Sequence, residues 1–143
     1  MSSTERIKRE VTRAALDAAD PRLAVDRAWS SPLEEAERVA LIAFGKASVA
    51  MTERVVERLG HRLARGLAIG VPERISAARL PSSVTTVETD HPIPTERNLR
   101  AADLLESFAH SLGEDETALV LISGGGSAQL ASPAAPVTLG DLA

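Results

Sequence analysis

The chain has 143 residues, of which 44% are hydrophobic and 2% aromatic, and its formal net charge is −4. This length and composition predict one domain with an aliphatic core, in which Trp29, Phe44 and Phe108 are the large rings. The acidic balance argues against a nucleic-acid or anionic-membrane partner. Without cysteine the chain has no disulfide, thiolate nucleophile or cysteine zinc site. Its charged start and short apolar runs predict neither a signal peptide nor a membrane span, and so a cytoplasmic protein.

Two helices are predicted ahead of the first strand. Apolar residues at helical spacing predict an amphipathic helix over residues 4–19. Asp20 followed by Pro21 is typical of a helix cap and a first helical residue, and predicts a second, short helix to about Trp29.

The rest of the chain alternates between strand and helix patterns. Strands are expected at residues 39–44, 66–71, 83–89 and 118–122, and helices at residues 46–59 and from 94 or 95 to 112. This alternation predicts an α/β fold, a three-layer α/β/α sandwich with a mainly parallel sheet. The first and fourth strands lack polar alternation, which predicts burial on both of their faces.

The end of the chain offers Thr138 or Asp141 as a helix cap and then stops within a few residues. A helix cannot persist at that length alone. We therefore expect the chain to be the first part of a longer protein. A sheet that lacks its later strands should leave an apolar edge or face uncovered.

The segment SGGGS follows the fourth strand, with Gly124, Gly125 and Gly126 between Ser123 and Ser127. Glycines after a strand let backbone N–H groups approach an anion closely, and the two hydroxyls add donors. The alternative is a simple strand-to-helix turn. A dinucleotide motif (GxGxxG) and a hydrolase elbow (GxSxG) both fail, because each would need glycine in place of Gln129.

Lys46 follows the first strand and is expected at the start of a helix. A cation is disfavoured at that positive end, and an anionic ligand would resolve the conflict. The Walker A phosphate loop is not met, because Ala40 and Ala47 stand at two of its required positions. The alternative is a solvated lysine with a long apolar stem.

Asp90 and His91 follow the third strand, in a turn that the two prolines of HPIP make stiff. Asp90 could hold a metal-bound water or act as a base, and His91 could donate to an anion. The alternative is that Asp90 caps the turn and His91 packs beside proline. In a parallel sheet all three segments lie at the carboxyl edge, where ligands bind.

Three other features are predicted to be structural. The three histidines have no metal-ligand spacing, so no metal ligand is assigned. A stripe of arginines at helical spacing is expected to be a solvated face. The acidic loop 113–117 is expected to face solvent only. The arginines of the stripe are Arg54, Arg58, Arg62 and Arg65.

The segments GKASVAMTE, DHPIPTERNLRAADLL and LISGGGSAQLASPAAPVTLGDL, in this order, resemble the N-terminal part of the type II glycerate kinases. The likeness covers most of the chain from Ile7 onward and is most specific in the last segment. The sequence departs from the family at Gln129, where an apolar residue is usual, and at Phe44 and Ser48, where small residues are common.

The resemblance implies an ATP-dependent kinase that phosphorylates D-glycerate at its 2-hydroxyl, although some family members carry the label hydroxypyruvate reductase. It implies a two-domain protein, with residues 1–143 as the N-terminal part of a Rossmann-like first domain and a smaller C-terminal domain that closes the site. The family's active-site lysine corresponds to Lys46 and its HPxP histidine to His91. Its glycine-rich loop corresponds to Ser123, Gly124, Gly125, Gly126 and Ser127.

The resulting hypothesis is phosphoryl transfer, which depends on positioning and charge neutralisation. The glycine loop would cradle either an ATP phosphate or the glycerate carboxylate, and Lys46 would neutralise charge on the transferred group. Mg²⁺ would bridge the phosphates, and Asp90 or a residue beyond Ala143 would accept the hydroxyl proton. The expected partners are small molecules, and a homo-oligomer is left open. The alternatives are a non-catalytic fragment or anion-binding module, and a hydroxypyruvate reductase.

Overall fold

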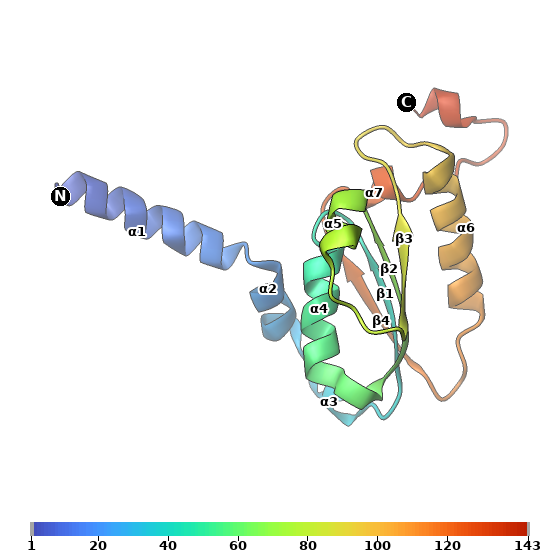
Figure 1. The fold of residues 1–143 in the computed structure, drawn as a ribbon, viewed down its shortest axis with the longest axis horizontal. Coiled ribbons are helices and arrows are strands. Elements are labelled where there is room, and N and C mark those ends of the chain that lie inside the picture. Colours follow the sequence, from blue (N-terminus) through green and yellow to red (C-terminus); the bar gives the residue numbers. More distant parts are fainter. Residues whose placement is uncertain (1, 143) are drawn as a thin grey trace.

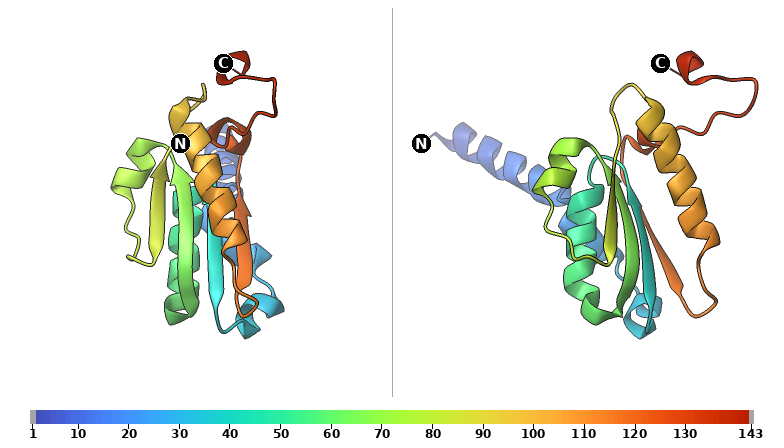
Figure 2. Two further views of the ribbon diagram at one scale, coloured as in Figure 1. Left: turned by 90° about the vertical axis from the view of Figure 1, so that its right-hand side faces the viewer. Right: turned by 45° about the vertical axis from the view of Figure 1, so that its right-hand side comes forward.

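A computed structural model describes residues 2–142 and contains one four-stranded sheet with the strand order β3-β2-β1-β4. All three neighbouring pairs are parallel, as predicted. The strands are β1 (Val39–Phe44), β2 (Leu63–Gly70), β3 (Val84–Glu88) and β4 (Thr117–Ile122). Helices lie on both sides of the sheet, which confirms the three-layer α/β architecture (Figures 1 and 2).

One face of the sheet carries most of the helices. The helix α4 (Ser48–Leu59) packs against β1 and β2, and α2 (Pro21–Ala28) packs against α4. Here Val55 and Leu59 meet Leu41 and Leu121 in an aliphatic cluster. The short helix α5 (Pro72–Ala77) lies on the same side, because Ile75 and Ser48 both approach Gly70.

The opposite face is covered by α6 (Glu96–His110), which packs on β2 and β3 (Figure 2). Leu67 and Ile69 point to this side and meet Ala101, with Phe44 and Phe108 at the margin of the cluster. Because β2 and β3 lie away from β4 in the strand order, this face of β4 stays exposed in the described chain.

The edge strand β4 differs from the prediction that it is buried on both faces. Leu121 is 8% exposed, whereas Val120 and Ile122 are 48% and 64% exposed. Buried and exposed residues alternate along β4 because helices cover only one of its faces within residues 2–142. The uncovered apolar face that we expected somewhere on the sheet is therefore on β4.

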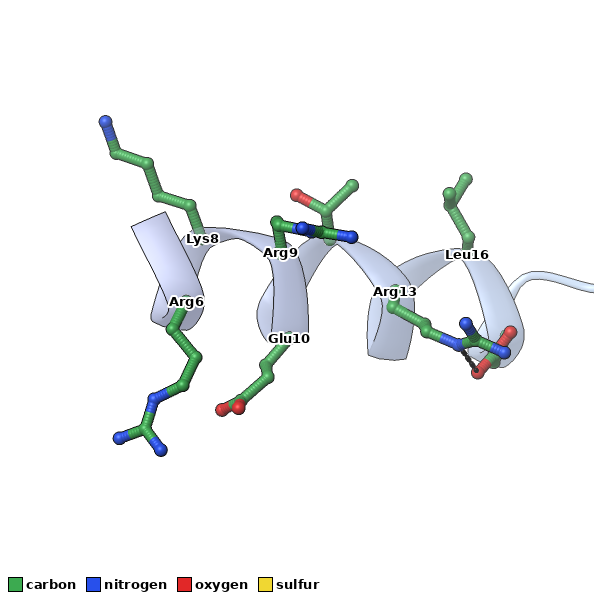
Figure 3. A pocket seen from close by; sticks show the side chains of 8 residues that line it. Arg6, Lys8, Arg9, Glu10, Arg13 and Leu16 are labelled. Atoms are coloured by element: carbon green, nitrogen blue, oxygen red, sulfur yellow. Dashed lines mark ion pairs between the residues drawn. The ribbon is translucent and has the colours of Figure 1, made fainter. Parts of the chain in front are cut away.

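The helix α1 (Ser3–Ala18) projects from the body of the molecule (Figure 1) and has no buried residue. Its apolar stripe is present as predicted, but Ile7, Val11 and Leu16 stay between 53% and 68% exposed. Figure 3 shows side chains spreading from this one helix. Arg13 and Asp17 of the helix form an ion pair of 3.9 Å. The hollow that they line has no second wall, and we assign no site to it.

The arginine stripe is not the solvated face that we expected. Arg54 and Arg58 both donate to Asp26 Oδ1, at 2.8 and 2.9 Å, and so hold α2 against α4. Arg62 donates to the carbonyl oxygens of Leu33, Glu34 and Ala36, at the end of the short helix α3 (Ser31–Glu35). These three arginines therefore fix α2 and α3 against α4 and the turn that follows it.

The prediction for the acidic loop was also wrong, because the Glu116 side chain is only 5% exposed. Arg65 donates to both Glu116 oxygens, at 3.0 and 2.6 Å, and the Gly113 N–H donates at 3.0 Å. These hydrogen bonds, that of Arg65 first, lower the pKa of Glu116 to about 2.

Element boundaries shift by a few residues. The helix predicted from residue 46 begins at Ser48, and β2 begins at Leu63, three residues early, because Leu63 is buried. The helices α3 and α5 were not predicted. Thr138 caps a short 3₁₀ helix, Leu139–Asp141, and α7 (Gly126–Gln129) follows the glycines. Within the described residues no helix combines the length and the apolar character needed to cross a membrane.

Candidate functional site at the carboxyl edge of the sheet

Three loops meet at the carboxyl edge of the sheet, after β1, β3 and β4. The chain leaves β1 toward β2 on one side, whereas β4 pairs with β1 on the other side. The strand order therefore reverses between β1 and β4, and ligands of open α/β sheets bind at such a switch point.

Backbone hydrogen bonds join the loops after β1 and β4. The Lys46 N–H donates to Gly124 O at 2.9 Å, and the Ser123 N–H donates to Phe44 O at 3.1 Å. The Ser123 hydroxyl accepts from the Ala47 N–H at 2.9 Å. Gly45 has a φ of +103°, and a Cβ there would collide with Ser123. The predicted ligand donor Ser123 thus also closes the two loops against each other.

Gly125 brings Lys46 and His91 together. Its φ is +85°, and a Cβ at this position would lie 3.1 Å from Lys46 Cγ and 3.2 Å from His91 Nε2. Two side chains from loops 45 residues apart in the sequence thus converge on one bare backbone position. The structure places the three predicted site segments together, and the roles of their residues stay predictions.

Each of the three positions in the loop is occupied by glycine for a different structural reason. Gly125 needs a left-handed backbone, and a Cβ at Gly126 would lie 2.9 Å from the Phe44 ring. Gly124, by contrast, is exposed and has no atom within 4 Å of its Cβ position. Among the described residues, no hydrogen bond uses the backbone N–H of Gly124, Gly125, Gly126 or Ser127. The loop therefore presents unpaired donors around an open position.

Lys46 is exposed and lies in the turn before α4, because that helix begins at Ser48, two residues later than we expected. The helix-dipole argument for an anion at Lys46 is correspondingly weaker. No ion pair within residues 2–142 involves Lys46. Its side chain lines a cavity of about 410 Å³, which also includes Arg74 from α5. The two cations follow neighbouring strands, β1 and β2.

Asp90 is held by its own turn. Its Oδ2 accepts from the Thr95 hydroxyl at 2.6 Å, and its Oδ1 lies 3.9 Å from the Arg97 guanidinium. These contacts match the capping alternative for Asp90, and its role as a base stays a prediction. His91, next to it, is half-buried and faces Gly125.

Two buried amide side chains at this edge were missed as site residues. Asn98 and Gln129 are both 0% exposed, and each forms hydrogen bonds to the loops that carry the site. Asn98 follows the helix cap Thr95 by three residues, which is the spacing of a capping box and could have drawn attention to it. In the sequence, Gln129 was notable mainly because it breaks the GxGxxG and GxSxG motifs.

Metal ligands are not evident at this edge. Within residues 2–142 no group of three His, Asp or Glu side chains is arranged to hold an ion.

Comparison with known proteins identifies the family. A family model described as a domain of unknown function, DUF4147, matches residues 7–143. The chain belongs to this family. A rat glycerate kinase is 38% identical over 115 residues, which cover 72% of this chain and 22% of that protein. An Agrobacterium vitis protein, provisionally named a hydroxypyruvate reductase, is 32% identical over 97% of this chain and 31% of its own length.

The fold comparison agrees with the sequence comparison. The crystal structure of glycerate kinase from Thermotoga maritima matches with a TM-score of 0.80 and 27% identity, over 97% of this chain and 33% of that one. The chain spans about a third or less of the length of these relatives. The resemblance to glycerate kinases inferred from the motifs is confirmed.

Proposed function

We propose that this chain carries part of a glycerate 2-kinase site, which transfers a phosphoryl group from ATP to the 2-hydroxyl of D-glycerate. The observation that carries the proposal is the convergence of Lys46 and His91 on Gly125, beside a loop with unpaired N–H donors. The kinase relatives support the reaction class. Since the chain spans a third or less of those relatives, the remaining site groups would come from sequence outside these 143 residues.

The glycine loop is proposed to bind an anionic oxygen. Gly124 has open space around its Cβ position, so neither crowding nor a left-handed backbone requires glycine there. A bare backbone at an open position fits the close approach of a ligand oxygen to the N–H groups. A simple turn explains Gly125 and Gly126 but not Gly124.

Lys46 is proposed to neutralise charge on the transferred phosphoryl group. The ammonium group has no carboxylate partner in the described chain, and its stem lies across Gly125. ATP with Mg²⁺ supplies the activated phosphoryl group. The hydroxyl oxygen of glycerate attacks the terminal phosphorus and ADP leaves, while a base takes the hydroxyl proton. Asp90 serves as that base only if its carboxylate leaves Thr95, so a base outside this chain is the competing assignment. A cytoplasmic location, where ATP is available, belongs to the same proposal.

The test replaces Lys46 by Ala in the complete gene product and measures turnover of ATP with D-glycerate. We expect kcat to fall by about 100-fold or more, as when a preorganised charge partner of the transition state is removed. Lys8→Ala is the matched control, because Lys8 is the other lysine of the chain and lies on the exposed helix α1. Near-normal turnover of Lys46→Ala would reject the assignment.

The competing functions are separated by two assays on the unsubstituted protein. ATP-dependent phosphorylation of D-glycerate supports the kinase, and oxidation of NAD(P)H with hydroxypyruvate supports the reductase after which one relative is provisionally named. Inactivity in both assays supports a non-catalytic fragment or an anion-binding module.

A further inference from the structure

The four-residue helix α7 carries the last of the three glycines and cannot hold its own position. Helices of this length do not persist without tertiary contacts, because the entropy lost in forming the first turn exceeds the stabilisation from its hydrogen bond. Gly125 is the residue just before it. Whatever fixes α7 therefore also fixes Gly125 between Lys46 and His91.

On one side, Asn98 connects α7 to the loop after β3. Its Oδ1 accepts from the N–H groups of Asp90 and Thr95, at 3.2 and 3.0 Å. Its Nδ2 donates to Asp90 O at 2.8 Å and to Ala128 O at 2.7 Å. Two partners can only donate and two can only accept, so the partners themselves define the orientation of the amide. One buried side chain thus fixes the residue before His91 relative to α7.

On the other side, Gln129 connects α7 to the loop after β1. Its Oε1 accepts from the Gly45 N–H at 2.8 Å, next to Lys46. Its Nε2 is buried and has no hydrogen-bond partner among the described residues. A buried unpaired donor is unfavourable, and an apolar side chain of the same length would avoid it. The hydrogen bond to Gly45 is therefore what this amide contributes.

We infer that Asn98 and Gln129 are positioning residues that hold Gly125 in place between Lys46 and His91. They act through consecutive residues, since Asn98 binds the carbonyl of Ala128 and Gln129 follows it. Neither needs to touch a substrate. Their effect on turnover rests on the proposed kinase function, whereas their effect on loop geometry does not.

The first test replaces Asn98 by Asp in the complete gene product. A carboxylate would face the carbonyl oxygens of Asp90 and Ala128, and the repulsion should displace α7. Protonation restores one donor, so the loss should be partly reversible by acid. We expect kcat to fall about 30-fold at pH 8 and to recover several-fold at pH 5.5, relative to the wild type at the same pH. Ser107→Asp adds the same charge to an exposed position of α6 and should keep the wild-type pH profile.

The second test replaces Gln129 by Met, which removes the acceptor and the unpaired donor together. The loss of one hydrogen bond should lower the melting temperature by only a few degrees, so the protein stays folded. If Gln129 had only a structural role, turnover should then change little. A positioning role predicts a fall in kcat of about tenfold with the protein still folded. It also predicts that exchange of the Gly45 amide hydrogen quickens about tenfold, while that of Leu41 in β1 does not.

The two tests separate the inference from the proposed function. A wild-type protein without kinase activity contradicts the proposed function, and the exchange rate of Gly45 then decides the positioning role. Unchanged Gly45 exchange in Gln129→Met overturns the inference. So does wild-type kcat in Gln129→Met, or a folded Asn98→Asp protein that follows the wild-type pH profile. If Asn98→Asp does not fold, the Gly45 exchange rate and the kcat of Gln129→Met test the inference instead.

Discussion

Arg65 and Arg38, at one end of the sheet, differ from Lys46, at the other end, in whether a carboxylate lies close to the cation. At the amino ends of the strands, Arg65 and Arg38 meet Glu116 and Asp115, and each cation has a carboxylate within 3.0 Å. At the carboxyl ends, Lys46 has no such partner in the described chain, and the amides that hold the loops are neutral. Charge that is neutralised locally stabilises the fold. Charge that is left uncompensated beside unpaired N–H donors is available to an anionic ligand.

The largest effect should come from a methyl group at the carboxyl edge, in Gly125→Ala. The substitution strains a backbone with a φ of +85° and presses on Lys46 and His91. We expect kcat/KM for D-glycerate to fall about 100-fold or more, because small displacements of positioning groups have effects of that size. Steady-state kinetics together with thermal unfolding measures both consequences.

Gly60→Ala is the control for backbone strain. Gly60 also has a positive φ, of 55°, but nothing lies within 4 Å of its Cβ position. We expect a loss of about 1–3 kcal/mol in stability and normal kinetics. Equal kinetic losses in the two variants would show that strain alone, and not the proximity of Lys46 and His91, explains Gly125.

A medium effect is expected at the amino edge, in Glu116→Gln, and it should appear in stability and not in turnover. The pKa of Glu116 is about 2 in the folded chain, against an ordinary value of 4.5. A lowered pKa contributes stability above pH 4.5, and this contribution is lost as the pH falls toward 2. The wild type should therefore be more stable than Glu116→Gln at pH 7, and the difference should shrink between pH 4.5 and 2.

Urea unfolding across this pH range measures the difference between the two proteins. Glu114→Gln is the matched control, because Glu114 is exposed and lies in the same loop. It should leave the pH dependence of stability unchanged. A Glu116→Gln protein whose stability follows that of the wild type at every pH would contradict the role of the Arg65 pair.

The smallest effect is expected for Arg38→Ala at the same edge. The pair between Arg38 and Asp115 spans 3.0 Å, but the two side chains are 55% and 70% exposed. Exposed pairs contribute little, so we expect a change of less than about 0.5 kcal/mol in the free energy of unfolding. A loss as large as that of Glu116→Gln would show that the amino edge acts as one coupled network and not mainly through Arg65 and Glu116.

The sequence predicted the sheet better than the helices around it. The apolar run of β1 and the single glycine at its end, Gly45, are local signals, and they placed the strand correctly. The helices α3 and α5 have five and six residues, which is too short for a periodic pattern. The start of α4 was misplaced by two residues because the turn at Lys46 is set by its hydrogen bond to Gly124, which is distant in sequence.

Solvent exposure was predicted less well than the positions of the strands, because burial depends on segments that are distant in the sequence. The same arginine spacing describes a solvated face or a face that binds α2 and α3, and only the position of Asp26 decides between them. Glu116 was assigned to solvent because its neighbours in sequence are acidic, whereas Arg65, its partner in space, lies in β2, 51 residues earlier in the chain.

For this protein, the sequence by itself determined the α/β alternation, the parallel sheet and the three loop segments that meet at one edge. These follow from periodicity, glycines and prolines, which act within a few residues. The tertiary structure alone decided that Gly125 is the point of convergence and that Asn98 and Gln129 hold it. Such contacts join residues that lie 30 and 84 positions apart, and their hydrogen bonds depend on a geometry that no local pattern records.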